Sequence, residues 1–134
     1  MTAEVLQAAL AAHFAPWVQA LGLRVEAVDA ASVTLRLPNT EQLARRGGML
    51  CGQAMMAAAD SAMVLALINH FGEFRPCATV QMHSSFLKPL SLQDALLQAR
   101  VLRCGKSLAF GEIDLRGAED QKSVCRASTT YALL

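Results

Sequence analysis

The chain has 134 residues, of which 54% are hydrophobic and 17% are charged, and its formal net charge is +1. This length predicts one domain over residues 1–134 with an ordinary core, and the apolar excess indicates further buried surface in a large core or a subunit interface. Because a nearly neutral chain has no general attraction to nucleic acid or to a membrane surface, we expect neither as a partner.

The cysteines and the first residues bear on the compartment. The four cysteines have no metal-ligand spacing, and they are Cys51, Cys77, Cys104 and Cys125. We therefore expect free cysteines in a reducing, cytoplasmic environment, with no metal and no cofactor. Glu4 stands where a signal peptide would have basic residues, so no signal peptide is expected. The longest apolar run is short for a membrane span and contains Asp60.

A helix followed by a β-hairpin is predicted for the first third of the chain. Ala3–Phe14 has apolar residues at helical spacing, with Thr2 as a suitable start and Pro16 just beyond the end. Leu23–Asp29 and Ser32–Leu37 alternate apolar and polar residues, and the short link between them predicts a hairpin. The positions expected to face inward are Leu23, Val25, Ala27, Val33, Leu35 and Leu37.

A long central helix is predicted from about Gly52 to about Asn69, because this run is rich in alanine and methionine and has no internal glycine or proline. Pro38–Arg46 before it is polar, with room for one helical turn, and Gly47–Gly48 makes a flexible approach. Apolar residues cover nearly the whole circumference, which predicts a helix buried on all sides. Asp60 is its only charged residue, and a buried carboxylate requires a partner or has a use.

Period-two patterns follow the central helix. The four strand candidates are Ala78–Leu87, Ala95–Cys104, Ser107–Leu115 and Val124–Leu133. Tight turns at Cys104–Ser107 and Gly117–Gln121 join antiparallel neighbours. A run of strands beside a long helix indicates an α+β fold. A sheet that covers such a helix has to curl about it, and its remaining surfaces fit a dimer.

Three stretches carry a resemblance to a known family. Gly47–Met63 reads GGMLCGQAMMAAADSAM, Thr79–Pro89 reads TVQMHSSFLKP, and Ala99–Ala109 reads ARVLRCGKSLA. In these stretches the chain resembles the hotdog-fold acyl-CoA thioesterases, in particular the phenylacetate-pathway (PaaI-like) branch of the 4-hydroxybenzoyl-CoA thioesterase superfamily. The resemblance covers about residues 20–134. It implies a long central helix wrapped by a curved antiparallel sheet, and a homodimer or a dimer of dimers.

One motif of that family is altered here. The family usually has His-Gly-Gly before its central helix, with an acidic residue eight positions after the first glycine. This chain has Cys51-Gly52-Gln53 at that place and keeps the acid as Asp60. A cysteine nucleophile would need a base, and no histidine is near in sequence, so the favoured role of Cys51 is packing.

Thioester hydrolysis requires a polarised carbonyl and a nucleophile or activated water. An N–H group of Gly52, or of Gln53 beside it, at a helix N-terminus suits the first task, and Gln53 could also orient the thioester or water. Asp60 suits the second task as nucleophile or general base. Eight residues of helix rise about 12 Å, so Asp60 does not easily serve Gly52 of its own chain. Two antiparallel copies of the helix would bring Asp60 of one close to Gly52 of the other.

Secondary site residues are named for the acyl-CoA substrate. Ser61 could hydrogen-bond near the site, although a bond to its own backbone is an equal alternative. The phosphates of coenzyme A call for cations, and the candidates are Lys88, Arg103 and Lys106, with Arg45 and Arg46 in addition. The resemblance favours Lys106 among these, while each taken individually is more often a solvated surface charge.

Two other functions stay open at this point. The missing histidine keeps a non-catalytic acyl-CoA- or lipid-binding hotdog protein as an alternative. A hotdog hydratase ranks lower, because the resemblance associates that activity with a histidine paired to an acid and none lies near Asp60 in sequence. Turnover measured with a thiol reagent separates an enzyme from a binding protein.

Overall fold

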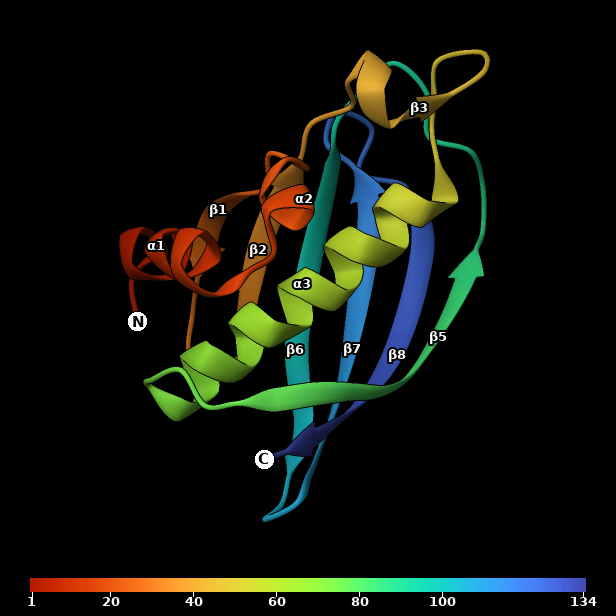
Figure 1. Ribbon diagram of the computed structural model, residues 1–134. Helices are drawn as coiled ribbons and strands as arrows, with labels where there is room; N and C mark the ends of the chain where they lie inside the picture. The colour runs from red at the N-terminus through yellow and green to blue at the C-terminus, as the bar shows by residue number, and fades with distance from the viewer.

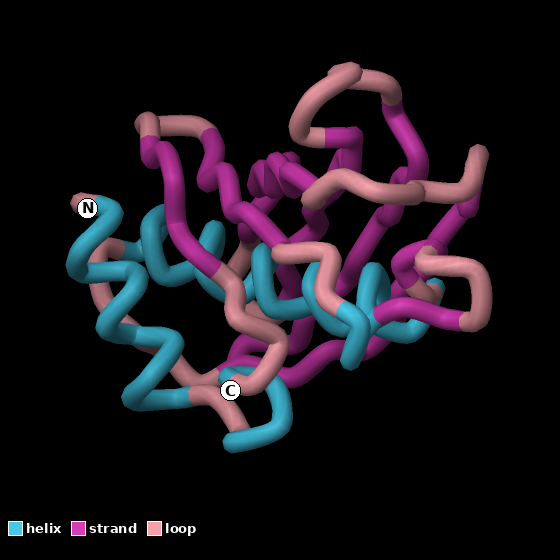
Figure 2. The backbone as a smooth tube through the Cα atoms, turned by 90° about the horizontal axis from the view of Figure 1, so that it is seen from above, coloured by secondary structure: helices cyan, strands magenta, loops and turns pink.

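A long helix, α3 (Gly52–Phe71), lies across the concave face of a six-stranded antiparallel sheet in the computed structural model, which describes residues 1–134 (Figure 1). Seen from above, strands pass on more than one side of the central helix, because the sheet curls around it (Figure 2). This arrangement confirms the α+β prediction and the curved sheet around one helix. By length and composition α3 could span a membrane, but its most apolar stretch is mostly buried inside the fold.

The other elements follow the predicted order. The remaining helices are α1 (Ala3–His13), α2 (Pro16–Gln19) and the 3-10 turn η1 (Glu41–Leu43). The strands of the large sheet are β1 (Arg24–Val28), β2 (Ser32–Leu37), β5 (Cys77–Phe86), β6 (Ala95–Cys104), β7 (Leu108–Gly117) and β8 (Ser123–Leu133), in the order β1-β2-β6-β7-β8-β5. A small separate hairpin consists of β3 (Ala44–Arg45) and β4 (Met49–Leu50).

The N-terminal segments differ from expectation in two places. The side chain of Thr2 caps α1 as predicted, accepting the N–H of Val5 at 3.2 Å. The short helix α2 was not predicted, and Pro16 occupies its first turn, where proline is well tolerated. The inward orientation predicted for Ala27 is wrong: the β1–β2 register shifts between Val25 and Ala27, and this bulge turns Ala27 outward.

The central helix is not buried on all sides in a single chain, contrary to the prediction. One stripe of α3 stays accessible or half-buried, and it consists of Gln53, Met56, Ala57, Asp60 and Val64. These positions recur every three or four residues, as one face of a helix does. The opposite face is buried in the core. We call this row of five residues the α3 stripe.

Strand β5 leaves a second surface without a partner. It pairs with β8 along one side only, and most of its residues are exposed, including Val80 at 60%. A long edge strand presents unpaired N–H and C=O groups and is normally covered. The α3 stripe and β5 are neighbours on the face seen in Figure 1.

Gly111 of β7 is predicted to be intolerant of a side chain. A Cβ at this position would lie 2.2 Å from Sδ of buried Met63 and 3.1 Å from the carbonyl oxygen of Arg100. Gly111→Ala should therefore lower the free energy of unfolding by about 1–3 kcal/mol, as overpacking does, measured by urea denaturation.

The matched control for this variant is Gly105→Ala in the β6–β7 turn, where the nearest atom to a new Cβ is the carbonyl oxygen of Leu108 at 3.7 Å. That change should stay within about 0.5 kcal/mol of wild type. Equal effects of the two substitutions would show that the close approach of α3 to β7 does not limit the packing.

Candidate active site

Cys51 holds the beginning of α3. The first turn of an α-helix has N–H groups that no carbonyl of the same helix can accept. The Cys51 thiol sulfur accepts the N–H of Ala54 at 3.4 Å, and its carbonyl oxygen accepts that of Met55 at 3.2 Å. Its own N–H donates to the carbonyl of Leu43 at 3.0 Å. Cys51 thus acts as the helix cap of α3.

Gly52 and Gln53 carry the two N–H groups of this turn that donate to no protein group. A Cβ at Gly52 would lie 3.4 Å from the ring of Phe86, an ordinary van der Waals contact, so Phe86 borders the backbone at this position. Two adjacent donors at the positive end of a 20-residue helix suit an oxygen that gains negative charge.

The carboxylate of Asp60 is fixed from the sheet side. Thr79 of β5 donates its hydroxyl to Oδ1 at 2.9 Å, and Tyr131 of β8 donates its hydroxyl to the same oxygen and to the Asp60 carbonyl, the latter at 2.9 Å. Thr79 and Tyr131 are opposite each other in the β5–β8 register. No protein group donates to Oδ2 of Asp60, so one carboxylate oxygen is held and the other is open.

Tyr131 is the only tyrosine of the chain and is 1% exposed. Burial, followed by the nearby Asp60 carboxylate, raises the pKa of the Tyr131 phenol. The phenol therefore keeps its proton at physiological pH and stays a donor to Asp60. Burial and then Asp60 also raise the pKa of the Cys77 thiol at the start of β5. Sequence reasoning missed Thr79 and Tyr131 as site residues, because only the strand register brings them to α3.

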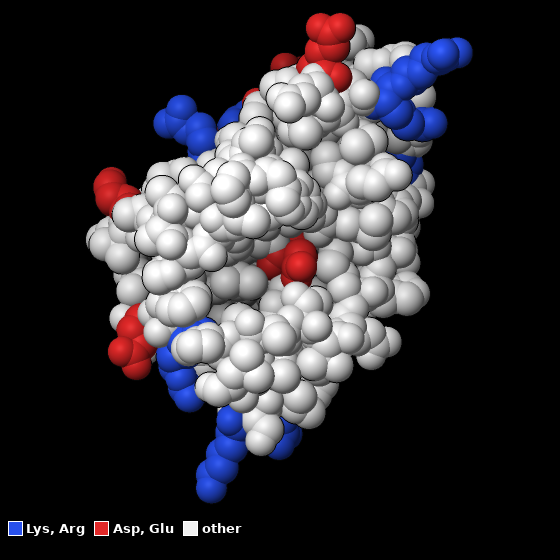
Figure 3. Space-filling model, in the orientation of Figure 1, with Lys and Arg blue, Asp and Glu red and all other residues white.

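The amides and the carboxylate do not form one site within a single chain. Gly52 and Asp60 are eight residues apart along a continuous helix, a rise of about 12 Å. Gln53 and Asp60 both belong to the α3 stripe, however, so both are presented on the same accessible side. Figure 3 shows this face as largely uncharged, with an acidic group in a central hollow and charged groups of both signs at the margins.

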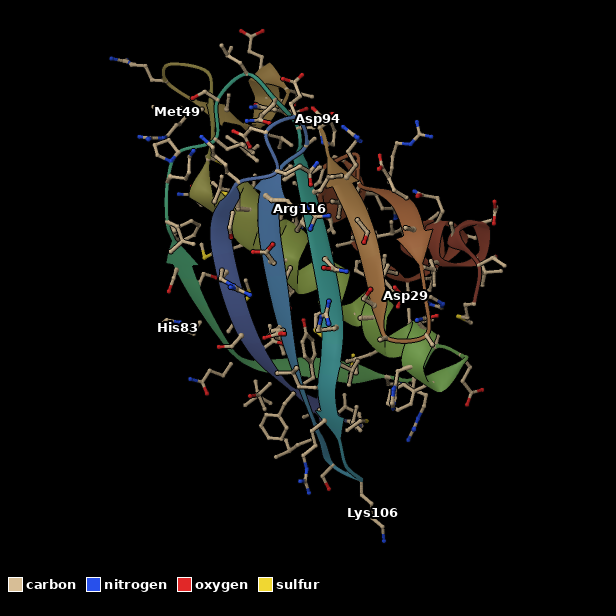
Figure 4. All side chains as sticks on the ribbon, turned by 180° about the vertical axis from the view of Figure 1, so that it is seen from behind. Asp29, Met49, His83, Asp94, Lys106 and Arg116 are labelled. Atoms are coloured by element: carbon tan, nitrogen blue, oxygen red, sulfur yellow. The ribbon has the colours of Figure 1, made fainter.

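The candidate cations lie at opposite ends of the molecule. Lys88 and Arg45 line a hollow of about 370 Å³ that also touches Gly52 and Phe86. Met49 belongs to β4, the strand just before the start of α3. Lys106 lies in the β6–β7 turn at the opposite end of the molecule from Met49 (Figure 4). Arg103, near the end of β6, belongs to that far end too.

The structure also shows the hydrogen bond of the Ser61 hydroxyl and how the side chains that can bind metals are distributed. Ser61 is buried and donates to the carbonyl of Ala57 at 2.8 Å, so it makes the backbone bond that was the alternative to a site role. No three side chains of histidine, cysteine, aspartate and glutamate lie close enough together to hold a metal ion.

A second hollow lies on the other side of the α3 start. It has a volume of about 360 Å³, is bounded by α2, η1 and the first turn of α3, and is lined mainly by apolar side chains. A larger hollow of about 570 Å³ surrounds the β3–β4 turn and touches Arg45 and Arg46.

The fold is shared with solved thioesterases. Thioesterase HI1161 from Haemophilus influenzae superposes with a TM-score of 0.89 at 20% identity, covering 100% of this chain and 91% of that chain. A mutant of thioesterase PA1618 from Pseudomonas aeruginosa gives a TM-score of 0.87 at 25% identity, covering 100% and 94%. Zebra fish thioesterase superfamily member 2 gives 0.87 at 24% identity, covering 100% and 99%.

A family comparison agrees with these superpositions. Residues 47–124, more than half of the chain, match the profile of the Thioesterase superfamily. The matched stretch contains the cap of α3, the two open amides, Asp60 and Thr79. The chain therefore belongs to the Thioesterase superfamily and is a thioester hydrolase of hotdog fold.

Proposed function

We propose that this protein is an acyl-CoA thioesterase that hydrolyses an acyl-CoA to the free acid and coenzyme A. The observation that carries the proposal is the pairing of two open amides, on Gly52 and Gln53, with a carboxylate held by one oxygen on the same side of α3. These are the two parts that thioester hydrolysis needs: a place for the carbonyl oxygen and a base or nucleophile.

The proposed site is shared between two copies of the chain. The α3 stripe and the open edge of β5 adjoin on one face, and both carry exposed apolar side chains, such as Met56 at 40%. A two-fold axis through this face would cover both surfaces in one interface. It would also set two α3 helices antiparallel, with Asp60 of one copy next to the start of α3 in the other.

The reaction follows from these positions. The amides of Gly52 and Gln53 bind the carbonyl oxygen and stabilise the negative charge that it gains. Acting as general base, Oδ2 of Asp60 takes a proton from water while the water oxygen adds to the carbonyl carbon. The C–S bond then breaks, and the departing sulfur receives that proton. As nucleophile, the same oxygen would add to the carbonyl carbon and expel the coenzyme A thiolate, giving a mixed anhydride that water then hydrolyses to the free acid and the regenerated carboxylate. In both versions Thr79 and Tyr131 hold Oδ1.

The nucleotide part of the substrate is assigned to cations near the open amides. Lys88 and Arg45 share the hollow that touches Gly52, so they are within reach of a coenzyme A that leaves the site on this side. In an antiparallel dimer the β6–β7 turn of the partner points toward the same end. Arg103 and Lys106 therefore keep their proposed phosphate-binding role as contributions of the second copy.

The finer assignments are also proposals. The eight-residue spacing from Gly52 to Asp60 supports the PaaI-like branch, and the uncharged face over α3 supports a homodimer that can pair further into a tetramer. All four cysteines are unpaired, which supports a reducing cytoplasm.

Asp60→Asn should lower kcat for acyl-CoA hydrolysis by about 10²–10⁴-fold, the usual contribution of a general base. The melting temperature should change little, because asparagine retains an oxygen for Tyr131 and Thr79. Glu119→Gln, a charge loss in the exposed β7–β8 turn, serves as control and should leave kcat unchanged. Wild-type turnover by the purified Asp60→Asn protein would exclude the catalytic role.

Mixed dimers test whether the site is shared. Asp60→Asn and Gly52→Val chains should each be inactive alone. After subunit exchange, each heterodimer contains one intact site, so an equal mixture should recover about a quarter of wild-type activity. Exchange demonstrated by native mass spectrometry without any recovered activity would contradict the shared site.

Tyr131→Phe should lower kcat by about tenfold with KM nearly unchanged, because a hydrogen bond to a charged group is worth about 1.5–3 kcal/mol. A lowered melting temperature with an unchanged kcat would instead assign Tyr131 a purely structural role.

A further inference from the structure

Trp17 is a large side chain in a position that core packing does not explain. It is the only tryptophan of the chain and is 64% exposed. It belongs to the short helix α2, which hydrogen bonds hold in place: the Gln19 side chain donates to the carbonyls of Phe14 at 2.8 Å and Ala11 at 3.4 Å. The indole is therefore carried on a fixed support beside the first turn of α3.

The hollow next to Trp17 has the character of an apolar ligand pocket. Its volume of about 360 Å³ exceeds the roughly 150 Å³ of an engineered cavity that binds benzene. No charged residue lines it. Its polar members are two glutamines, and small-molecule pockets typically combine apolar walls with a few such groups. The lining of this hollow includes Trp17, Leu21, Leu43, Cys51, Gln53 and Ala54.

The two hollows beside the α3 start differ in charge, and each is lined by one of the two residues with an open amide. Gly52 lines the hollow that contains Lys88 and Arg45, and Gln53 lines the apolar hollow beside Trp17. An acyl-CoA has the same asymmetry about its carbonyl, with phosphates on the sulfur side and an apolar chain on the other. Placing the carbonyl at the amides thus directs the acyl chain toward Trp17.

We propose that the hollow between α2 and α3 is the acyl-binding pocket, that it takes medium-chain or aromatic acyl groups in preference to acetyl, and that Trp17 determines this specificity. The inference rests on the proposed acyl-CoA thioesterase function. Each methylene buried in the pocket contributes about fourfold to affinity, so chains that reach the indole are favoured over acetyl.

Binding is tested without turnover by the fluorescence of Trp17 in the Asp60→Asn protein. Octanoyl-CoA should shift the emission of this single tryptophan to shorter wavelength, because the acyl chain removes water from the indole. Coenzyme A alone at the same saturation should leave the emission in place. Equal emission shifts with octanoyl-CoA and with coenzyme A would overturn the proposal. An unshifted emission at an octanoyl-CoA concentration that calorimetry shows to be saturating would also overturn it.

Specificity is tested by Trp17→Ala in the active enzyme. It should lower kcat/KM for octanoyl-CoA and phenylacetyl-CoA by about tenfold or more, and for acetyl-CoA by less than about twofold, since several methylenes lose their contact. Trp17→Phe should restore most of the loss. Val5→Ala removes exposed apolar surface on α1 away from the pocket, and it should leave kcat/KM unchanged for all three substrates.

The outcomes separate the pocket from the function on which it rests. An equal loss on all three substrates, with a native circular dichroism spectrum, would show that Trp17 does not contact the acyl chain and would overturn the proposal. Absence of hydrolysis of every acyl-CoA by wild type would refute the proposed function, and the fluorescence titration with octanoyl-CoA would still decide whether the pocket binds an acyl chain.

Discussion

A helix cannot satisfy the N–H groups of its own first turn, and the way this protein handles that constraint determines its chemistry. Cys51 accepts one of these donors, the N–H of Ala54, through its sulfur, and its own N–H is paired with η1. The donors of Gly52 and Gln53 are left over at the positive end of the longest helix. A cap that is complete except at these two adjacent positions forms a preorganised binding site for an oxygen atom without any charged side chain.

The sheet supplies the second half of the site. Because α3 lies against the strands at close range, which the missing side chain of Gly111 permits, Thr79 and Tyr131 reach Asp60 from two neighbouring strands. Their hydrogen bonds stabilise a carboxylate in an otherwise apolar helix and leave its second oxygen open. The same interactions that make Asp60 tolerable to the fold thus fix the orientation of its carboxylate.

Sequence reasoning located the residues whose signal is local. Asp60 stood out because it is the only charge in an apolar helix, and the family resemblance located Gly52. Tyr131 did not stand out, because its contact with Asp60 depends on the register of β8, 71 residues away. The four-residue helix α2 is too short to show a helical period, so the environment of Trp17 was missed as well. The bulge that exposes Ala27 likewise has no signature in an alternating pattern.

Charge and exposure divide the surroundings of the α3 start into three regions. The hollow that contains Lys88 and Arg45 is the cationic region, and the hollow beside Trp17 is the apolar region. The third region is the face formed by the α3 stripe and the edge of β5, which no other part of the chain covers. A substrate with a phosphate-bearing half and an apolar half matches the first two regions, and a second copy of the chain matches the third. The two hollows and the unpartnered face therefore surround the same open amides.

The most direct test of the shared site is the crystal structure of the Asp60→Asn protein with a ketone analogue of an acyl-CoA, in which a methylene separates sulfur and carbonyl. We expect the ketone oxygen about 3 Å from the N–H groups of Gly52 and Gln53, with the substituted side chain at position 60 of a second copy beside the carbonyl carbon. A carbonyl bound away from the α3 start, or a site built from one chain alone, would contradict this arrangement.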